Sequence, residues 1–274
     1  MKISIITINR NNESGLKRTI ESVIAQSLPE FEYIVIDGAS TDGSVDVIKQ
    51  YADKIDYWVS EPDKGIYNAM NKGILKANGE YLLLLNSGDW LVDEFVLDDF
   101  CNAGFVEDVV SGNIYLVDSS DYVQHRSPLK EDLSFSCFYW GSLPHPASFV
   151  RRELFAKYGL YNEENKIVSD KEFFLKVLVE NNCSYNHFER NIACFNLDGI
   201  SSQEEWTELH KEETERVLRK YLQPFIYKSF LQINAENQEL KKHEIKYREY
   251  MNLMNGKFSC IIKFILRLKE LNKR

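Results

Sequence analysis

Residues 2–38 read KISIITINRNNESGLKRTIESVIAQSLPEFEYIVIDG, and this stretch decides the fold. The apolar run at each end is typical of a buried strand. Between the two runs, Leu16, Ile20, Val23 and Ile24 fall on one face of a helix. A strand, a helix and a second strand in this order predict a right-handed crossover that joins two parallel strands.

The same alternation continues toward the C-terminus. It predicts helices at 42–54 and 65–77, and strands at 56–61 and 80–85. Beyond residue 100 it predicts a strand at 108–117, a strand running into a helix at 144–159, and helices at 169–182 and 204–222. The fold class is therefore α/β, with a mostly parallel central sheet, flanking helices on both faces and a helical C-terminal extension.

Composition restricts the classes of protein to which this chain can belong. The chain has 274 residues, of which 44% are hydrophobic and 27% are charged, as in ordinary globular proteins. Its five cysteines include no C-x-x-C pair, so neither a disulfide framework nor a zinc site is indicated. The apolar run at the N-terminus is too short for a signal peptide, and no stretch reaches the roughly 18 apolar residues of a membrane span. We therefore expect a cytoplasmic protein.

Charge is distributed unevenly along the chain. Residues 241–274 hold ten Lys or Arg and three Glu, a net charge of +7. Because the whole chain has a net charge of −9, residues 1–240 have a net charge of −16. The acidic body argues against nucleic acid as a partner. In the basic tail, residues 257–274, five apolar residues share one helical face: Phe258, Ile261, Ile262, Ile265 and Leu268. Two interpretations stay open: the tail lies on an anionic membrane, or it packs on the protein itself or on a second subunit in a homodimer.

Polar residues follow each of the first four predicted strands: Thr7 and Asn9, then Asp37, then Asp63, then Asp89. The carboxyl ends of parallel strands meet at one edge of a sheet, so these groups are expected in one crevice. The sequence contains neither G-x-G-x-x-G nor G-x-x-x-x-G-K-[ST], so the common backbone cradles for phosphate are missing. A metal held by Asp89 would neutralise a bound nucleotide instead. The alternative is that residues 86–89 form only a turn.

Five segments carry a resemblance to a known family. They are SIITINRNN (4–12), VIDGASTDGS (35–44), SEPDKGIYNAMNKGI (60–74), LLLLNSGDWL (82–91) and VSDKEFFLKV (168–177). In this order and spacing, over roughly residues 1–200, the chain resembles the family 2 glycosyltransferases of the GT-A fold, especially those of bacterial polysaccharide and lipopolysaccharide assembly. The resemblance implies a nucleotide-sugar donor, most often a UDP-sugar, a divalent cation (Mn²⁺ or Mg²⁺), and inversion at the anomeric carbon.

The resemblance also implies roles for single residues. Thr7 and Asn9 match positions beside the nucleotide base, Asp37 matches the first acid of a conserved motif, and Asp63 matches the acid that closes the base pocket. Asp89 matches the acid that meets the metal, where one or two carboxylates suffice because the diphosphate supplies further ligands.

The match departs from the family at two places. Gly38 stands where many members have a second consecutive acid, and Asn86-Ser87-Gly88-Asp89 stands where many have three acids. Asp170, which opens a predicted helix, matches the catalytic base, although an acid there also complements a helix dipole. Glu172 is expected to point elsewhere.

Three further polar residues are candidates with open alternatives. His145 contacts metal, diphosphate or acceptor, or is a plain loop histidine. Lys64 faces the diphosphate or is solvated. Ser201 belongs to a predicted loop over the donor and can donate to phosphate.

The expected organisation is a GT-A domain at 1–222, with a nucleotide-binding half (1–100) and an acceptor-side half (101–222), followed by a helical extension at 223–274. The acceptor is expected to be a saccharide or a lipid-linked saccharide, which fits an enzyme docked on the inner face of the cytoplasmic membrane. A sugar nucleotidyltransferase is the second enzyme class, but the first loop lacks its Gly-rich basic character. A non-catalytic scaffold is the third possibility, because Asn86 and Gly88 replace acids.

Overall fold

The strand, helix and strand predicted for the first residues are present. Strands β1 (Ile3–Asn9) and β2 (Glu32–Asp37) pair in parallel, with α1 (Glu13–Ile24) between them in the chain. Every residue of both strands is buried, as expected for strands covered on both faces. The structure is a computed structural model that describes residues 3–118, 123–126, 133–197 and 206–255.

The central sheet has the order β3-β2-β1-β4-β8-β6-β9-β5, with β7 paired to β6. Its other strands are β3 (Tyr57–Ser60), β4 (Tyr81–Leu84), β5 (Trp90–Leu91), β6 (Val109–Val117), β7 (Val123–Arg126), β8 (Ser148–Arg151) and β9 (Tyr185–Asn196). The neighbours β3, β2, β1 and β4 are parallel, whereas β8 runs antiparallel to both β4 and β6. The first four strands in the chain thus form one parallel block, and β6 and β9 form a second parallel pair in the mixed remainder of the sheet.

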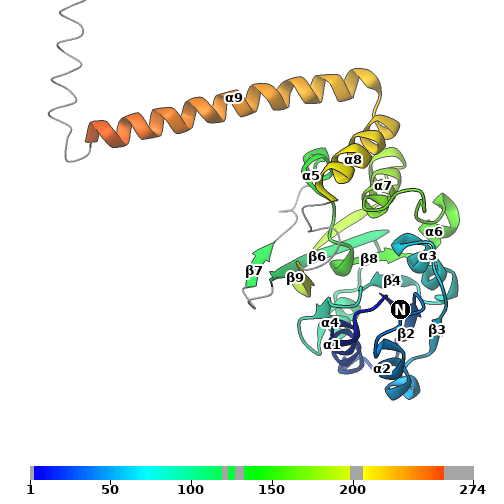
Figure 1. The fold of residues 1–274 in the computed structure, drawn as a ribbon. Coiled ribbons are helices and arrows are strands. Elements are labelled where there is room, and N and C mark those ends of the chain that lie inside the picture. Colours follow the sequence, from blue (N-terminus) through cyan, green and yellow to red (C-terminus); the bar gives the residue numbers. More distant parts are fainter. Residues whose placement is uncertain (1–2, 119–122, 127–132, 198–205, 256–274) are drawn as a thin grey trace, which may run out of the picture. The chain divides into compact units, whose positions relative to one another are not determined.

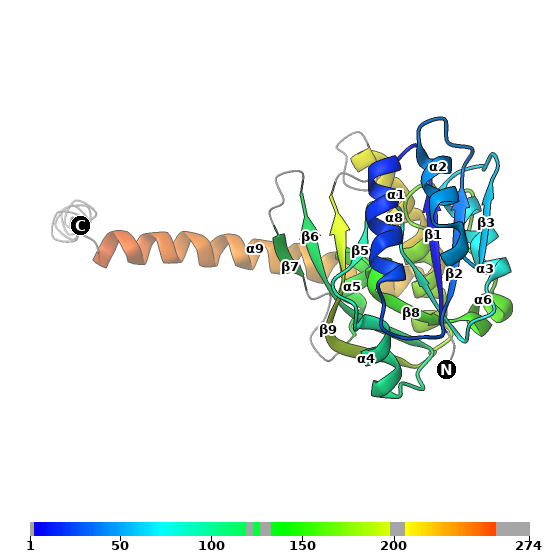
Figure 2. The same cartoon turned by 90° about the horizontal axis from the view of Figure 1, so that it is seen from below.

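Helices cover both faces of this sheet (Figures 1 and 2). One face carries α1, α2 (Ser44–Gln50) and α4 (Val96–Ala103), and the other carries α3 (Ile66–Lys76) and α6 (Arg152–Tyr158). Gly73 brings α3 close to the sheet, because a Cβ at this position would lie 2.3 Å from Ile6. The other described helices before residue 222 are η1 (Ala52–Lys54), α5 (Phe135–Trp140), η2 (His145–Ala147), α7 (Ser169–Phe174) with its π-helical continuation η3 (Leu175–Glu180), and α8 (Thr207–Tyr221). The predicted α/β class with flanking helices is confirmed.

The chain divides into two compact units, residues 1–221 and residues 222–274. In the second unit, α9 (Pro224–Asn255) is a helix of 32 residues, which confirms the expected helical extension. Over the described residues, no helix is both long and apolar enough to cross a bilayer. The predicted amphipathic tail, 257–274, lies outside the described residues.

Candidate active site

The first three strands of the parallel sheet end side by side. The register of the sheet pairs Asn9 with Asp37, and Asp37 with Ser60. These three side chains therefore meet at the carboxyl edge, where open α/β sheets bind ligands. Of the polar strand ends that the sequence analysis expects to converge, Asn9 and Asp37 are in contact at this point.

Asp37 is fully buried and accepts hydrogen bonds from three neighbours. The Nδ2 of Asn9 donates at 2.8 Å, Ser60 Oγ at 2.6 Å, and Ser40 through both its backbone N–H (2.9 Å) and its Oγ (2.5 Å). Burial raises the pKa of Asp37, but these donors together hold it below its usual value. A carboxylate accepts about four hydrogen bonds, so Asp37 is saturated by the protein. Its visible role is to hold the loop after β2 in place.

Asp63 occupies the space above Gly38. One carboxylate oxygen of Asp63 accepts the N–H of Gly65 at 3.0 Å, and the other lies 2.2 Å from the position that a Cβ on Gly38 would take. A side chain at residue 38 would therefore displace Asp63. Gly38 thus leaves room for the carboxylate of Asp63. Lys64, the next residue, has an exposed side chain.

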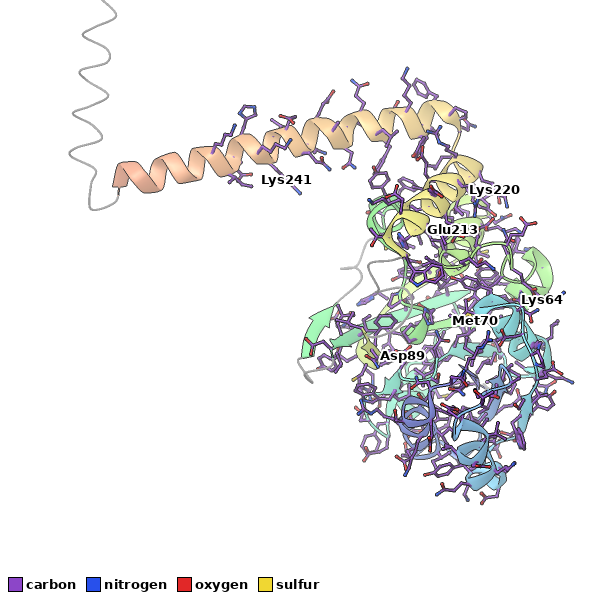
Figure 3. The ribbon with its side chains drawn as sticks, in the orientation of Figure 1. Lys64, Met70, Asp89, Glu213, Lys220 and Lys241 are labelled. Atoms are coloured by element: carbon purple, nitrogen blue, oxygen red, sulfur yellow. The ribbon has the colours of Figure 1, made fainter. Side chains whose placement is uncertain are left out.

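Asp89 lies in the turn after β4, close to β9 (Figure 3). It is 4% exposed, and its Oδ1 accepts the backbone N–H of Asn196 at 2.9 Å. The turn is held from α1 because the Thr19 hydroxyl donates to the Asp89 carbonyl (2.6 Å) and accepts the Gly88 N–H (3.0 Å). Gly88 has a φ of +104°, which favours glycine. Burial raises the pKa of Asp89 to about 7, so its negative charge lacks compensation within the protein.

The residues of this turn fit a divalent cation brought by a diphosphate. The side-chain Oδ1 of Asn86 is buried and has no hydrogen-bond partner among the described residues. Amide and carboxylate oxygens are the ligands that Mn²⁺ and Mg²⁺ prefer. In the described part of the chain, no group of three or more His, Cys, Asp or Glu side chains could hold a metal ion. The donor set is therefore too small for a resident all-protein centre and adequate for a cation with phosphate ligands.

His145 is near both this turn and Asp170. Its Nε2 is 3.0 Å from Nδ2 of Asn86, so the ring is a neighbour of the turn. Burial lowers the pKa of His145, and the negative charge of Asp170 partly offsets this effect. The imidazole is therefore neutral at pH 7, and its Nε2 accepts the Asn86 amide proton.

Asp170 lies in the first turn of α7, as predicted, and the Tyr67 hydroxyl donates to it at 3.1 Å. Tyr67 comes from α3, so this bond links two segments far apart in the chain. Burial, followed by the charge of Asp170, raises the pKa of Tyr67 far above its usual value, so the hydroxyl stays a donor. Glu172 points elsewhere, as predicted: it accepts from Asn165 at 2.6 Å and Lys220 at 2.6 Å.

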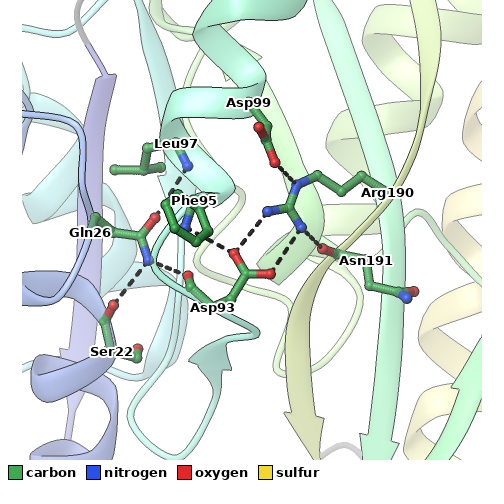
Figure 4. Close-up of polar contacts among 8 residues, drawn as sticks. All are labelled: Ser22, Gln26, Asp93, Phe95, Leu97, Asp99, Arg190 and Asn191. Atoms are coloured by element: carbon green, nitrogen blue, oxygen red, sulfur yellow. Dashed lines mark hydrogen bonds and ion pairs between the residues drawn. The ribbon is translucent and has the colours of Figure 1, made fainter.

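Arg190 of β9 holds the segment that follows Asp89 (Figure 4). Its guanidinium binds Asp93 at 2.8 Å and Asp99 at 2.6 Å. On the other side, the Gln26 amide donates to the Asp93 carbonyl at 2.6 Å and accepts the Leu97 N–H at 3.2 Å. The segment after the turn is thus fixed to both α1 and β9.

The structure does not bring the side chain of Thr7 into the site. Thr7 is fully buried, and its hydroxyl lies 3.1 Å from the equally buried Tyr33 hydroxyl. Ser201 lies outside the described residues. Sequence reasoning missed Tyr67, Thr19 and the backbone of Asn196, because no local pattern marks a contact between distant segments.

The comparisons with known proteins agree with this geometry. The model of the family "Glycosyl transferase family 2" matches residues 4–159. The chain is 34% identical over 210 residues to an uncharacterised glycosyltransferase of Mycobacterium tuberculosis, covering 74% of this chain and 78% of the relative. It is 28% identical over 181 residues to a PGL/p-HBAD biosynthesis glycosyltransferase of Mycobacterium bovis, covering 63% and 68%.

Among solved structures, TarS of S. aureus, residues 1–349 in complex with UDP-GlcNAc, has the same fold. The TM-score is 0.64 at 20% identity, over 81% of this chain and 71% of that chain. The match to another, longer TarS structure covers 43% of the length of that TarS chain. The family match covers more than half of the chain, and the M. tuberculosis relative exceeds 30% identity over about three quarters of it. The chain therefore belongs to glycosyltransferase family 2, with the GT-A fold.

Proposed function

We propose that this glycosyltransferase moves a sugar, with inversion, from a UDP-sugar to a hydroxyl of a saccharide or lipid-linked saccharide acceptor. The single observation that carries the proposal is the position of His145, which contacts Asn86 of the Asp89 turn and experiences the charge of Asp170. We assign diphosphate binding to the Asp89 turn and proton transfer to Asp170, and this one ring interacts with both. The relative in PGL/p-HBAD biosynthesis supports a role in surface polysaccharide or glycolipid assembly.

Asp170 acts as the general base in this mechanism. It takes the acceptor hydroxyl proton while that oxygen bonds to the anomeric carbon and the bond from this carbon to the diphosphate breaks, which releases UDP. The Tyr67 hydroxyl orients the carboxylate during this transfer. Asp89 and Asn86 would hold Mn²⁺ or Mg²⁺, which when bound supplies positive charge at the departing diphosphate.

For the donor, we assign Asn9, Asp37 and Asp63 to the nucleotide side of the site. The UDP-GlcNAc complex of TarS supports a uridine nucleotide. Asp63 provides the base contact, since Asp37 is saturated, and Asn9 is held by Asp37 at 2.8 Å. The exposed Lys64 contributes positive charge toward the diphosphate.

The sequence resemblance also assigns Thr7 and Ser201 to this side of the site. For Thr7 we assign only a supporting role within β1, because its hydroxyl is engaged with Tyr33. Ser201 would donate to phosphate, which rests on the sequence alone.

We also assign the basic tail, residues 257–274, to an anionic membrane surface. Six Lys or Arg and one Glu accompany an apolar stripe in this segment. A chain docked there meets lipid-linked acceptors by diffusion in two dimensions.

A donor screen tests the proposal. UDP-sugars with Mn²⁺ should raise the melting temperature of the protein, because ligands that bind only the native state stabilise it. Asp89→Ala should remove the metal-dependent part of the rise, while Asp46→Ala, a change at a side chain 85% exposed, should keep it. If no nucleotide sugar binds and none is hydrolysed, the protein is a non-catalytic scaffold. An unchanged metal response in Asp89→Ala would remove Asp89 from the site.

A further inference from the structure

Helix α9 carries a heptad pattern. From Ile226 onward, positions separated alternately by four and three residues are mostly apolar. They are Ile226, Phe230, Ile233, Asn237, Leu240, Glu244, Tyr247, Met251 and Met254. With Ile226 at heptad position d and Phe230 at position a, seven of these nine positions are apolar or aromatic. Spacing of this kind over four heptads is typical of a coiled coil.

Most of the described part of this stripe is exposed, whereas Phe230 is half-buried. Ile226 is 49% exposed, Ile233 is 56% exposed and Leu240 is 66% exposed. A helix of 32 residues is about 48 Å long, and helices in proteins owe most of their stability to packing of an apolar face. Exposed aliphatic side chains repeated along one line of such a helix indicate an interaction surface.

We propose that the partner on this surface is α9 of a second copy of the chain, in a parallel, in-register two-stranded coiled coil. Asn237 at position a would then face its own counterpart, and paired Asn amides at one a position specify register and two strands. Glu236 is at position g and Lys241 at the following e position, and both are exposed. In the parallel register, Glu236 of one copy meets Lys241 of the other, so their charges are complementary.

The pattern also bears on the strength of association. Asn237 and Glu244 place polar side chains at two successive a positions, and polar residues there lower coiled-coil stability. The dimer is therefore reversible and depends on protein concentration. It goes beyond the proposed transfer reaction, and it would bring two catalytic units and two basic tails into one assembly.

Sedimentation velocity of the full chain over a range of concentrations tests the dimer. The native chain should be a dimer at micromolar concentration, and Ile233→Glu at position d should weaken dimerisation at least 100-fold. Ile245→Glu is the matched control: Ile245 is 57% exposed on the same helix but lies at position b, outside the stripe. Circular dichroism should show the same fold in both variants, and donor binding per subunit should be unchanged.

A charge exchange tests the register. Glu236→Lys should weaken the dimer, and adding Lys241→Glu should restore it, because the double variant recreates the pair in the opposite sense. The proposal is wrong if the native chain is monomeric, if Ile233→Glu and Ile245→Glu have equal effects, or if the double variant is no better than Glu236→Lys. Association seen only with anionic vesicles would place the helix on lipid instead. None of these outcomes affects the assignment of the transfer reaction.

Discussion

At the scale of single residues, the environment of Asp89 disfavours its charge. Burial raises its pKa to about 7 although its side chain accepts the Asn196 N–H, and among the described residues the Oδ1 of Asn86 is buried without a hydrogen-bond partner. The proposed cation would compensate both defects together. The turn would then cost stability in the free protein and recover it when donor and metal bind.

This cost predicts a pH dependence for metal-free protein. Between about pH 4 and pH 7 the native state keeps a proton on Asp89 that the unfolded chain has lost, so the free energy of unfolding falls as pH rises through this range. Asp89→Asn removes the cost and should be more stable than the native chain at pH 8, by roughly 1–4 kcal/mol. At pH 4 the two should be equal. Urea denaturation with a chelator at both pH values measures the difference.

The control is the same comparison in the presence of UDP and Mn²⁺. There the native chain should have the higher free energy of unfolding, because only its Asp89 carboxylate binds the cation. An Asp89→Asn variant less stable than the native chain at pH 8 would show that the carboxylate is already compensated.

Asp170 is expected to affect turnover and not donor binding. Because a general base contributes about 10²–10⁴-fold to rate, Asp170→Asn should lower kcat at least about 10²-fold while the Kd for UDP-sugar stays unchanged. Tyr67→Phe removes only the orienting hydroxyl and should cost about 10-fold. Single-turnover kinetics and calorimetric titration separate the two effects. Near-normal turnover in Asp170→Asn would assign the proton to another group, such as His145.

At the scale of elements, β9 fixes the Asp89 turn from two directions. Its end supplies the Asn196 N–H to Asp89, and its middle supplies Arg190 to Asp93 and Asp99. Strand β5, directly after Asp89, pairs antiparallel with β9. The turn is therefore placed by the mixed half of the sheet as well as by β4.

This arrangement predicts the effect of Arg190→Met. Arg190 is 17% exposed and its partners Asp93 and Asp99 are 39% and 48% exposed, so solvent screens the pairs and the loss should be about 1–2 kcal/mol. Burial raises the pKa of Asp93, but the hydrogen bonds from Arg190 and from the Phe95 N–H, with the charge of Arg190, outweigh this effect, so the net pKa is lowered. The stability that this pair contributes is therefore present above about pH 4 and is lost as pH falls through the native pKa. The penalty of Arg190→Met should thus shrink at pH 3.

Arg219→Met is the matched control for Arg190→Met. Arg219 pairs with Glu215 on the surface of α8, and both side chains are more than half exposed, so the change should cost less than about 0.5 kcal/mol. Unfolding is measured in urea, because urea is uncharged and does not screen the ion pairs as guanidinium chloride would. Equal losses in the two variants would show that Arg190 has no special role.

At the scale of the whole molecule, the charge of the chain is divided between an acidic body and a basic end. Deleting residues 257–274 should abolish co-sedimentation with anionic liposomes at moderate salt and leave donor hydrolysis intact, because the tail carries six of the basic residues and none of the site. Liposomes of neutral lipid are the control and should bind neither protein. If the shortened chain unfolds or changes its oligomeric state while the full chain ignores anionic liposomes, the tail belongs to a protein interface.

The sequence by itself determined the first half of the fold. Strands buried on both faces require continuous apolar runs, and the helices between them require a 3.6-residue period, so both can be recognised locally. The same logic located Asn9, Asp37 and Asp89, because polar residues that end buried strands of a parallel sheet must share an edge.

Only the tertiary structure decided how these side chains are used. The bonds from Asn196 to Asp89 and from Tyr67 to Asp170 join residues more than 100 positions apart. Asp37 proved to be saturated by its neighbours, and Thr7 to be engaged with Tyr33. No local pattern contains such contacts, because packing of distant elements sets which donor reaches which acceptor and how much water each carboxylate keeps.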